Sequence, residues 1–129
     1  GMGDLPELVA RMEAAGLAVD LRVDGDLERV DGTAGQVGYR VVQEGLTNAH
    51  KHGRRRGARV RIAVGAAALR IEILNQVAPA SEGDVPGDQL GLLGIRERVA
   101  SAGGTVEAGL DGIDFRLLVE LPIAERRRG

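Results

Sequence analysis

In the stretch YRVVQEGLTNAHKHG, residues 39–53, apolar and polar side chains each recur with the period of an α-helix. Its apolar members share one face of a helix: Tyr39, Val42, Leu46 and Ala49. Its polar members Glu44, Asn48 and Lys51 have the same spacing and line a second face, about opposite the first. The stretch therefore predicts a long helix that packs on a core with one side and presents a polar side to a cleft or solvent.

The polar side of this helix has the side chains that a phosphoryl-transfer site needs. The oxygen of Asn48 is a hard ligand that suits Mg²⁺, and the carboxylate of Glu44, one turn earlier, can orient or deprotonate an attacking group. Lys51 or His52, at the end of the helix, can reach phosphate oxygens. A solvated helix face with ordinary i, i+4 pairs accounts for the same spacing, so the spacing alone leaves both interpretations open.

A second stretch, LGLLGIRERVASAGG at residues 90–104, places glycines where a loop enters a helix. Gly91 and Gly94 free the backbone to approach a ligand closely, and the first helical N–H groups then point at a bound phosphate. Residues 79–89 before it have no period, which predicts a mobile surface loop that could close over a nucleotide. The alternative is that these glycines only shape the loop or allow close helix packing.

The other periodic segments complete an α+β sandwich, with helices on one face of a mixed, largely antiparallel sheet. The expected helices are 5–15, the segment from Asp31 or Thr33 as a cap to Gly53, and the segment from Leu92 to Gly103-Gly104. The expected strands are 17–25, 58–65, 69–77, 105–110 and 113–122. Short turns separate the second strand from the third and the fourth from the fifth, which predicts two antiparallel hairpins.

Composition limits the partners of this chain. Its 129 residues suit one domain with one core. Only 2% of the residues are aromatic and the net charge is −2, so we expect no binding of nucleic acid. The chain lacks cysteine and any apolar run near the roughly 20 residues of a membrane span, which predicts a cytoplasmic domain without membrane contact.

Three regions are expected along the chain. Residues 1–3 are interpreted as a tag remnant, residues 4–124 as the domain, and residues 125–129 as a basic tail. We therefore expect the natural protein to be longer than this sequence.

The two quoted stretches together resemble the N box and the second glycine box of histidine-kinase ATPase domains (HATPase_c), in the GHKL superfamily. In detail they resemble bacterial two-component sensor kinases, whose N box reads QE-x-LTNA-x-KH and whose glycine box runs into G-[MI]-RERV. The likeness extends from the strand that begins at Gly16 to the closing strand at Leu121-Pro122. It implies the Bergerat-type ATP-binding two-layer sandwich, with ATP and Mg²⁺ as cofactors.

The same resemblance implies a role for each motif residue. Glu44 matches the catalytic carboxylate of the N box, and Asn48 matches the asparagine that binds Mg²⁺ with the nucleotide. Lys51 and His52 match the residues that approach the phosphates. The remaining nucleotide contacts are expected from the two glycine boxes: Asn75, Gly91, Leu92 and Gly94.

The function implied is that of the ATP-binding catalytic domain of a sensor histidine kinase, which donates the ATP γ-phosphoryl group to a histidine on a dimerisation domain. Neither His50 nor His52 is the expected acceptor, because both lie within the N box, and the acceptor segment is absent from this chain. The fragment is therefore not expected to phosphorylate itself. The expected partners are the dimerisation helices of the parent kinase and, indirectly, a response regulator; we expect the isolated domain to be monomeric.

Three positions depart from the family pattern. The first glycine box is usually D-x-G-x-G, and its aspartate accepts a hydrogen bond from the adenine amino group, whereas Asn75 stands there in this chain. An amide oxygen can still accept that bond, but without charge assistance, so weaker or altered base recognition is expected. Gln89 replaces the leading glycine of the second glycine box, and Asp114 stands where many relatives have a threonine near the adenine.

Two other functions fit the same residues. A serine kinase of the anti-sigma-factor type shares the fold, although the Lys-His ending of the N box and the RERV helix favour the histidine-kinase branch. A degenerate, non-catalytic module that binds a partner protein fits the altered first glycine box. The presence of Glu44, Asn48 and Lys51 argues against a complete loss of activity.

Overall fold

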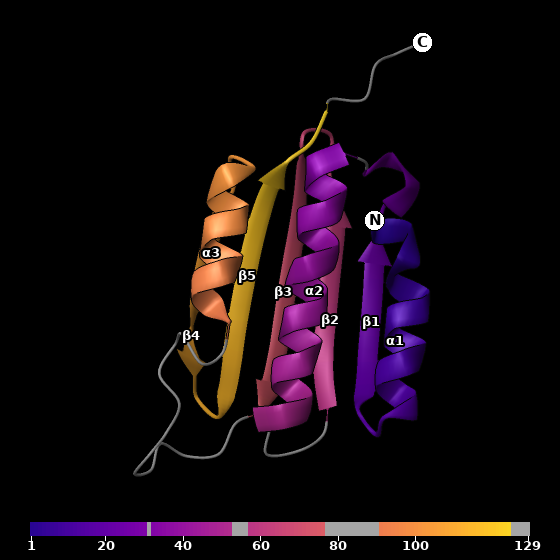
Figure 1. Cartoon of the computed structure of the whole chain (residues 1–129), viewed down its shortest axis with the longest axis vertical. Helices are drawn as coiled ribbons and strands as arrows, with labels where there is room; N and C mark the ends of the chain where they lie inside the picture. Colours follow the sequence, from indigo (N-terminus) through magenta and orange to yellow (C-terminus); the bar gives the residue numbers. More distant parts are fainter. Residues whose placement is uncertain (31, 53–56, 77–90, 125–129) are drawn as a thin grey trace.

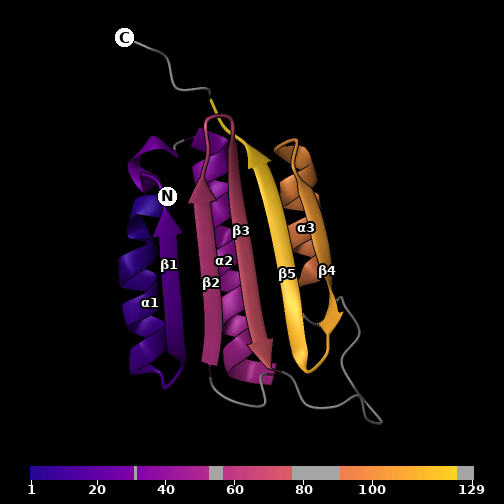
Figure 2. The same ribbon diagram turned by 180° about the vertical axis from the view of Figure 1, so that it is seen from behind.

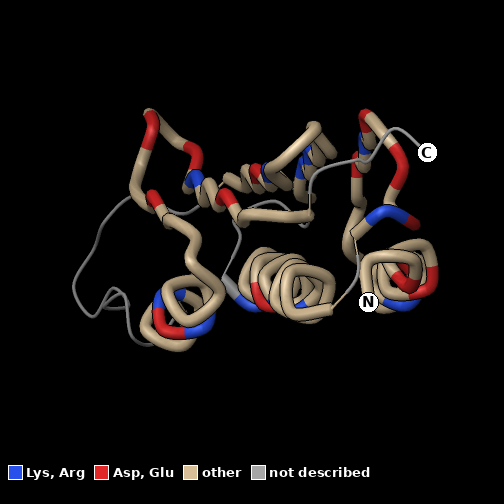
Figure 3. Tube along the Cα trace, turned by 90° about the horizontal axis from the view of Figure 1, so that it is seen from above, with Lys and Arg blue, Asp and Glu red and all other residues tan. Residues whose placement is uncertain are grey.

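The computed structural model describes residues 1–30, 32–52, 57–76 and 91–124. Within this described part the chain forms two layers, a five-stranded sheet and three α-helices that all cover the same face of it (Figures 1 and 3). The α+β sandwich predicted from the sequence is therefore confirmed. The expected loop at 79–89, which includes Gln89, lies outside the described residues, as do the helix cap Asp31 and the basic tail.

The elements follow one another in the order that the sequence predicts. They are η1 (Met2–Asp4), α1 (Leu5–Ala14), β1 (Ala18–Asp24), η2 (Leu27–Arg29), α2 (Gly32–His52), β2 (Gly57–Val64), β3 (Ala68–Gln76), α3 (Leu92–Ser101), β4 (Thr105–Asp111) and β5 (Asp114–Pro122). The strand order is β1-β2-β3-β5-β4, in which β1 pairs with β2 in parallel and the other pairs are antiparallel. The first pair is parallel because α2 connects its strands by crossing one face of the sheet. Both predicted hairpins are present.

Helix α2 lies between α1 and α3 and contacts both of them as well as the sheet (Figure 1). Its predicted apolar face is largely buried, but Val37 and Val41, on another side, are buried too. Gly45 allows a close approach to β3, because a Cβ atom at this position would overlap with Cδ1 of Ile73. Despite its 21 residues, α2 is not apolar enough to cross a membrane, and neither is any other helix in the described ranges.

The core lies between the sheet and the helices. Alternate residues of the strands point into it, because strand side chains alternate between the two faces of a sheet. Its largest fully buried side chains are Met2, Leu5, Leu17, Leu46, Leu69, Ile71, Ile73, Ile95, Leu121, Val41, Val42 and Val60. Met2 thus helps to form the core, while the interpretation of residues 1–3 as a tag remnant concerns their origin and stays a prediction.

No described helix covers the opposite face of the sheet, which we call the open face (Figure 2). Charged residues of both signs lie along it (Figure 3). Arg61 pairs with Asp20 across β1 and β2, with 3.3 Å between Nη2 and Oδ2. On β3 and β5, Nε of Arg116 lies 2.7 Å from Oε2 of Glu72. The charges of this face are thus partly neutralised within the sheet.

Candidate functional site

Three segments that are far apart in the sequence meet at one end of the molecule: the C-terminal ends of α2 and β3 and the start of α3 (Figure 1). Helix α2 contacts both of the other elements. The residues singled out in the sequence are distributed over these segments: Glu44, Asn48, Lys51 and His52 on α2, Asn75 on β3, and Gly91, Leu92 and Gly94 at α3. The fold therefore gathers the candidate residues at one end of the sandwich.

The carboxylate of Glu44 lies against the backbone of Gly91. A Cβ atom added to Gly91 would be 3.1 Å from Oε2 of Glu44. Gly91 is the N-cap of α3 and has a φ of 72°, in the left-handed region that favours glycine. A larger residue is thus disfavoured twice, by the backbone conformation and by the neighbouring carboxylate. This contact joins the two stretches that the sequence marks as chemically unusual.

The polar row of α2 is partly covered by the elements that surround the helix. Glu44 and Asn48 are half-buried, while Lys51 is exposed. The sequence predicts a polar side that faces a cleft or solvent, and the half-burial of the first two residues fits a cleft. They are half-buried because α2 is packed against the sheet and against a helix on either side, which buries more than one stripe of its surface. Of His52, only the backbone at the end of α2 is described.

His50 has a structural contact that sequence reasoning missed. Its Nε2 lies 3.0 Å from the carbonyl oxygen of Ala15, in the turn between α1 and β1. The ring therefore faces α1 and ties the end of α2 to that turn. Only the helical period, which places His50 off the polar row of Glu44 and Asn48, indicated in advance that it points elsewhere.

At the start of α3, the two candidate residues after Gly91 have different surroundings. The side chain of Leu92 is 9% exposed and belongs to the core, so a contact with a ligand would come from its backbone N–H in the first helical turn. Gly94 is half-buried, and a Cβ atom there would meet nothing nearer than Nη1 of Arg98 at 4.0 Å. The helix start thus offers free backbone donors next to open space.

Asn75 lies near the end of β3 on the side that faces the helices and is 6% exposed. Its Nδ2 donates to the carbonyl oxygen of Gln76 at 3.4 Å, a long hydrogen bond. Its partner in the sheet register is Phe115, whereas Asp114 is paired with Gln76. Because paired residues point to the same face, Phe115 is the neighbour of Asn75 and Asp114 lies on the open face. The register thus separates Asp114 from Asn75, and the expected position of Asp114 near the adenine stays a prediction.

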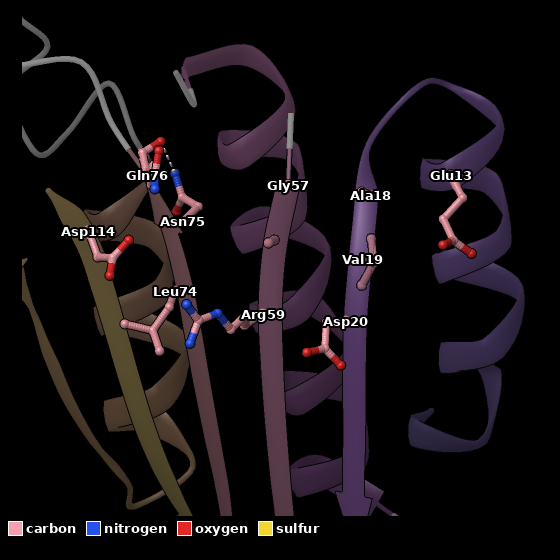
Figure 4. A pocket seen from close by; sticks show the side chains of 11 residues that line it. Glu13, Ala18, Val19, Asp20, Gly57, Arg59, Leu74, Asn75, Gln76 and Asp114 are labelled. Carbon is pink, nitrogen blue, oxygen red and sulfur yellow. Dashed lines mark hydrogen bonds between the residues drawn. The ribbon is translucent and has the colours of Figure 1, made fainter. Parts of the chain in front are cut away.

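A pocket of about 400 Å³ lies at the end of the sheet that includes Asn75 (Figure 4). It is lined by residues of α1, β1, β2, β3 and β5. Of the predicted nucleotide-binding residues, those within the described ranges contribute only Asn75 to it. The pocket is therefore distinct from the cluster around Glu44 and Gly91.

Comparison with known proteins gives a clear result for the fold. No family model matches the chain, and no curated protein matches it in sequence. Among solved structures, the blue-light activated histidine kinase of Erythrobacter litoralis EL346 superposes with a TM-score of 0.67 at 20% identity, over 95% of this chain and 42% of that protein. The catalytic domain of the histidine kinase ThkA gives 0.69 at 14% identity, over 94% and 93%. Full-length ShkA gives 0.68 at 17% identity, over 97% and 30%.

These similarities identify the class of two-layer sandwich to which this fold corresponds. The chain has the fold of histidine-kinase catalytic domains, as the sequence motifs predict. It spans less than half of the length of the Erythrobacter kinase and of ShkA, and nearly the whole of the ThkA catalytic domain.

Proposed function

We propose that this chain is the ATP-binding catalytic domain of a sensor histidine kinase, which donates the ATP γ-phosphoryl group to a histidine on a separate dimerisation domain. The observation that carries the proposal is the contact between Glu44 and Gly91. This contact joins the Glu44 carboxylate on α2, the helix that resembles the N box, to the glycine at the start of α3. The shared fold supports the same function, and one structural neighbour, ShkA, is described in complex with AMPPNP.

In this proposal the nucleotide phosphates lie between the end of α2 and the start of α3. Backbone N–H groups of the first turn of α3, together with Lys51 and His52, bind the phosphate oxygens. Glu44 orients the attacking group, and its half-buried position makes its charge act more strongly than it would in bulk water. Catalysis then rests on positioning and electrostatic stabilisation rather than on a covalent intermediate with this domain.

The residues also fit a magnesium ion that is held mainly by the nucleotide. In the described ranges, no three His, Cys, Asp or Glu side chains form a metal-binding group. Mg²⁺ commonly uses one or two protein oxygens and completes its shell with phosphate oxygens and water. Asn48, with Glu44 one turn earlier on the same half-buried edge, supplies such oxygens. Bound Mg²⁺ would neutralise charge on the phosphates during transfer.

Base recognition is proposed to involve Asn75. Its buried amide lies on the helix side of β3, where the family aspartate would meet adenine. With Nδ2 engaged by the carbonyl of Gln76, Oδ1 is the end of the amide that can accept from the adenine amino group. This neutral acceptor gives a weaker hydrogen bond than a carboxylate would.

Isothermal titration with Mg·ATP tests the proposal. We expect binding between micromolar and submillimolar Kd for the wild-type chain and no measurable binding for Asn48→Ala. A matched control is Gln36→Ala, because Gln36 is an exposed polar residue on the same helix but at its other end. This variant is expected to bind like the wild type.

The opposite result would change the assignment. If the folded wild-type chain gives no binding heat at any accessible concentration, the kinase function is wrong and the degenerate partner-binding module replaces it. If ATP binds, the parent protein distinguishes the remaining alternatives. A histidine kinase gives an acid-labile phosphoryl adduct on the dimerisation helices, whereas an anti-sigma-factor-type kinase gives acid-stable phosphoserine on a partner protein.

The proposal also sets the partners. The direct partner is the pair of dimerisation helices that carries the phosphoacceptor histidine, and a response regulator follows it in the phosphorelay. We propose that the domain works in the cytoplasm, where ATP is available, and that the parent protein can be membrane-anchored. Nucleic acid has no role in this function.

A further inference from the structure

The pocket on the open face contains an arginine that has no partner among the described residues. Arg59 projects from β2 into it (Figure 4), and no described residue forms an ion pair or hydrogen bond with its guanidinium. Its register partner on β1 is Asp20, but the carboxylate of Asp20 lies 3.3 Å from Arg61 and 3.9 Å from Arg22. The neighbouring arginines thus neutralise Asp20, and Arg59 is left as an open donor.

The surroundings of Arg59 leave room for a ligand and give it an apolar floor. Leu74, its cross-strand partner on β3, lines the pocket with its side chain on the same face as Arg59. Gly57 removes a side chain from the rim: a Cβ atom there would meet nothing nearer than the carbonyl oxygen of Ala18, at 3.6 Å. The volume of about 400 Å³ is within the range of small-molecule sites.

A carboxylate lies on the far side of this floor from Arg59. Asp114, at the start of β5, lines the same pocket (Figure 4) and has no hydrogen bond or ion pair within the described ranges. It is half-buried, so its charge is less screened than that of a fully exposed carboxylate. Within the described ranges, the pocket therefore presents an unpaired cation and an unpaired anion across an apolar surface.

We propose that this pocket binds a small zwitterion with a nonpolar side chain, of the kind represented by the branched and unbranched apolar α-amino acids. The ligand carboxylate accepts two parallel hydrogen bonds from Arg59, and its ammonium group donates to Asp114. Its side chain covers Leu74. A purely anionic ligand would leave Asp114 unpaired, and a purely cationic one would leave Arg59 unpaired.

Amide NMR shifts of the nucleotide-free chain provide the test, with L-leucine, L-isoleucine, L-valine and L-methionine as probes. We expect saturable shifts at the amides of Gly57, Arg59 and Leu74 for at least one probe. For a leucine-responsive site, 4-methylpentanoate lacks the ammonium group and 3-methylbutylamine lacks the carboxylate. Each is expected to bind at least about tenfold more weakly, which corresponds to the loss of one charged contact.

Substitutions inside and outside the pocket test whether amino-acid binding depends on Arg59 and Asp114 in particular. Arg59→Gln and Asp114→Asn are each expected to weaken amino-acid binding at least about tenfold, by the same loss of a charged contact. Arg70→Gln is the matched control, because Arg70 is exposed on β3, has no partner among the described residues and lies outside this pocket. It is expected to bind like the wild type, and unchanged amide spectra elsewhere show that the variants are folded.

Three results would overturn the proposal. One is the absence of saturable shifts with all four amino acids up to about 10 mM, where a millimolar site would be mostly filled. Another is equal binding of the analogues that lack one charge. The third is wild-type affinity in Arg59→Gln or Asp114→Asn. Because no nucleotide is present, these outcomes are independent of whether the chain binds ATP.

Discussion

At the scale of single residues, the candidate site includes a glycine whose backbone conformation disfavours other residues. Gly91 has a positive φ, and a Cβ atom there would lie 3.1 Å from Oε2 of Glu44, which would have to shift slightly. Gly94, three residues later, has neither constraint, because it is in helical conformation with open space around it. The two glycines of one motif therefore have different physical roles.

This difference predicts opposite effects of alanine at the two positions. Gly91→Ala is expected to lower the free energy of unfolding by about 1–2 kcal/mol, the cost of a left-handed conformation for a residue with a Cβ atom. Gly94→Ala is expected to raise it by about 0.5–1 kcal/mol, because alanine favours the helix. Urea unfolding followed by circular dichroism measures both. Equal destabilisation by the two substitutions would contradict this assignment.

A second prediction at this scale concerns Asn75. Asn75→Asp restores a charged acceptor for the adenine amino group and is expected to tighten Mg·ATP binding roughly fivefold, a gain of about 1 kcal/mol. Without nucleotide the same carboxylate is buried beside β3, so the unfolding free energy is expected to fall by about 1 kcal/mol. Calorimetry and urea unfolding measure the two effects. Unchanged affinity would show that Asn75 does not contact the base.

At the scale of elements, helix α2 decides how the site is built. It packs against the sheet and between two helices, and this brings Glu44 to the start of α3. Its distance from β3 is set by Gly45, which leaves space for Ile73. His50 connects the C-terminal end of α2 to the turn after α1. The position of the polar row is therefore a result of close helix packing.

Close packing at Gly45 predicts a coupling between two substitutions. Gly45→Ala is expected to destabilise by about 1–2 kcal/mol, because overlap with Cδ1 of Ile73 outweighs the gain in helix propensity. Ile73→Val removes that carbon at a cost of about 0.5–1.5 kcal/mol. The double variant should be more stable than the sum of the two effects predicts. Additive unfolding free energies from a double-mutant cycle would refute the contact.

At the scale of the whole molecule, the described surface is polar with few exposed apolar side chains. The large exposed ones are Val23, Leu93, Leu110 and Ile113. Val23 and Leu93 lie on β1 and α3, and Leu110 and Ile113 lie at the β4–β5 hairpin, so they form no broad apolar face. The open face of the sheet is lined mainly by charged residues, several of them paired. Obligate dimer interfaces are larger and more apolar than such a surface.

This surface predicts that the chain by itself is a monomer. Sedimentation velocity should give a single species of the monomer mass, 13.5 kDa, at concentrations up to about 100 μM, well above the Kd of a stable protein pair. Addition of Mg·ATP should leave that mass unchanged, because the proposed site lies within one chain. A dimer that persists on dilution would contradict the prediction.

The sequence by itself determined the kind and order of the elements. Periods of 3.6 and two residues are local signals, and they predicted α2, the hairpins and the start of α3 near Leu92. The resemblance of 43–53 and 90–104 to the N box and the second glycine box predicted phosphoryl transfer, and that prediction used no contact between them. These properties depend on neighbours along the chain, which a single sequence shows.

Only the tertiary structure decided which side chains share a face and which are buried. The register of β3 with β5 places Phe115, not Asp114, beside Asn75. Packing of α2 half-buries Glu44 and brings it to Gly91. Asp20 pairs with Arg61, and Arg59 has no partner among the described residues. Each of these results depends on strand register and helix packing between distant segments, and the local period of a sequence does not contain that information.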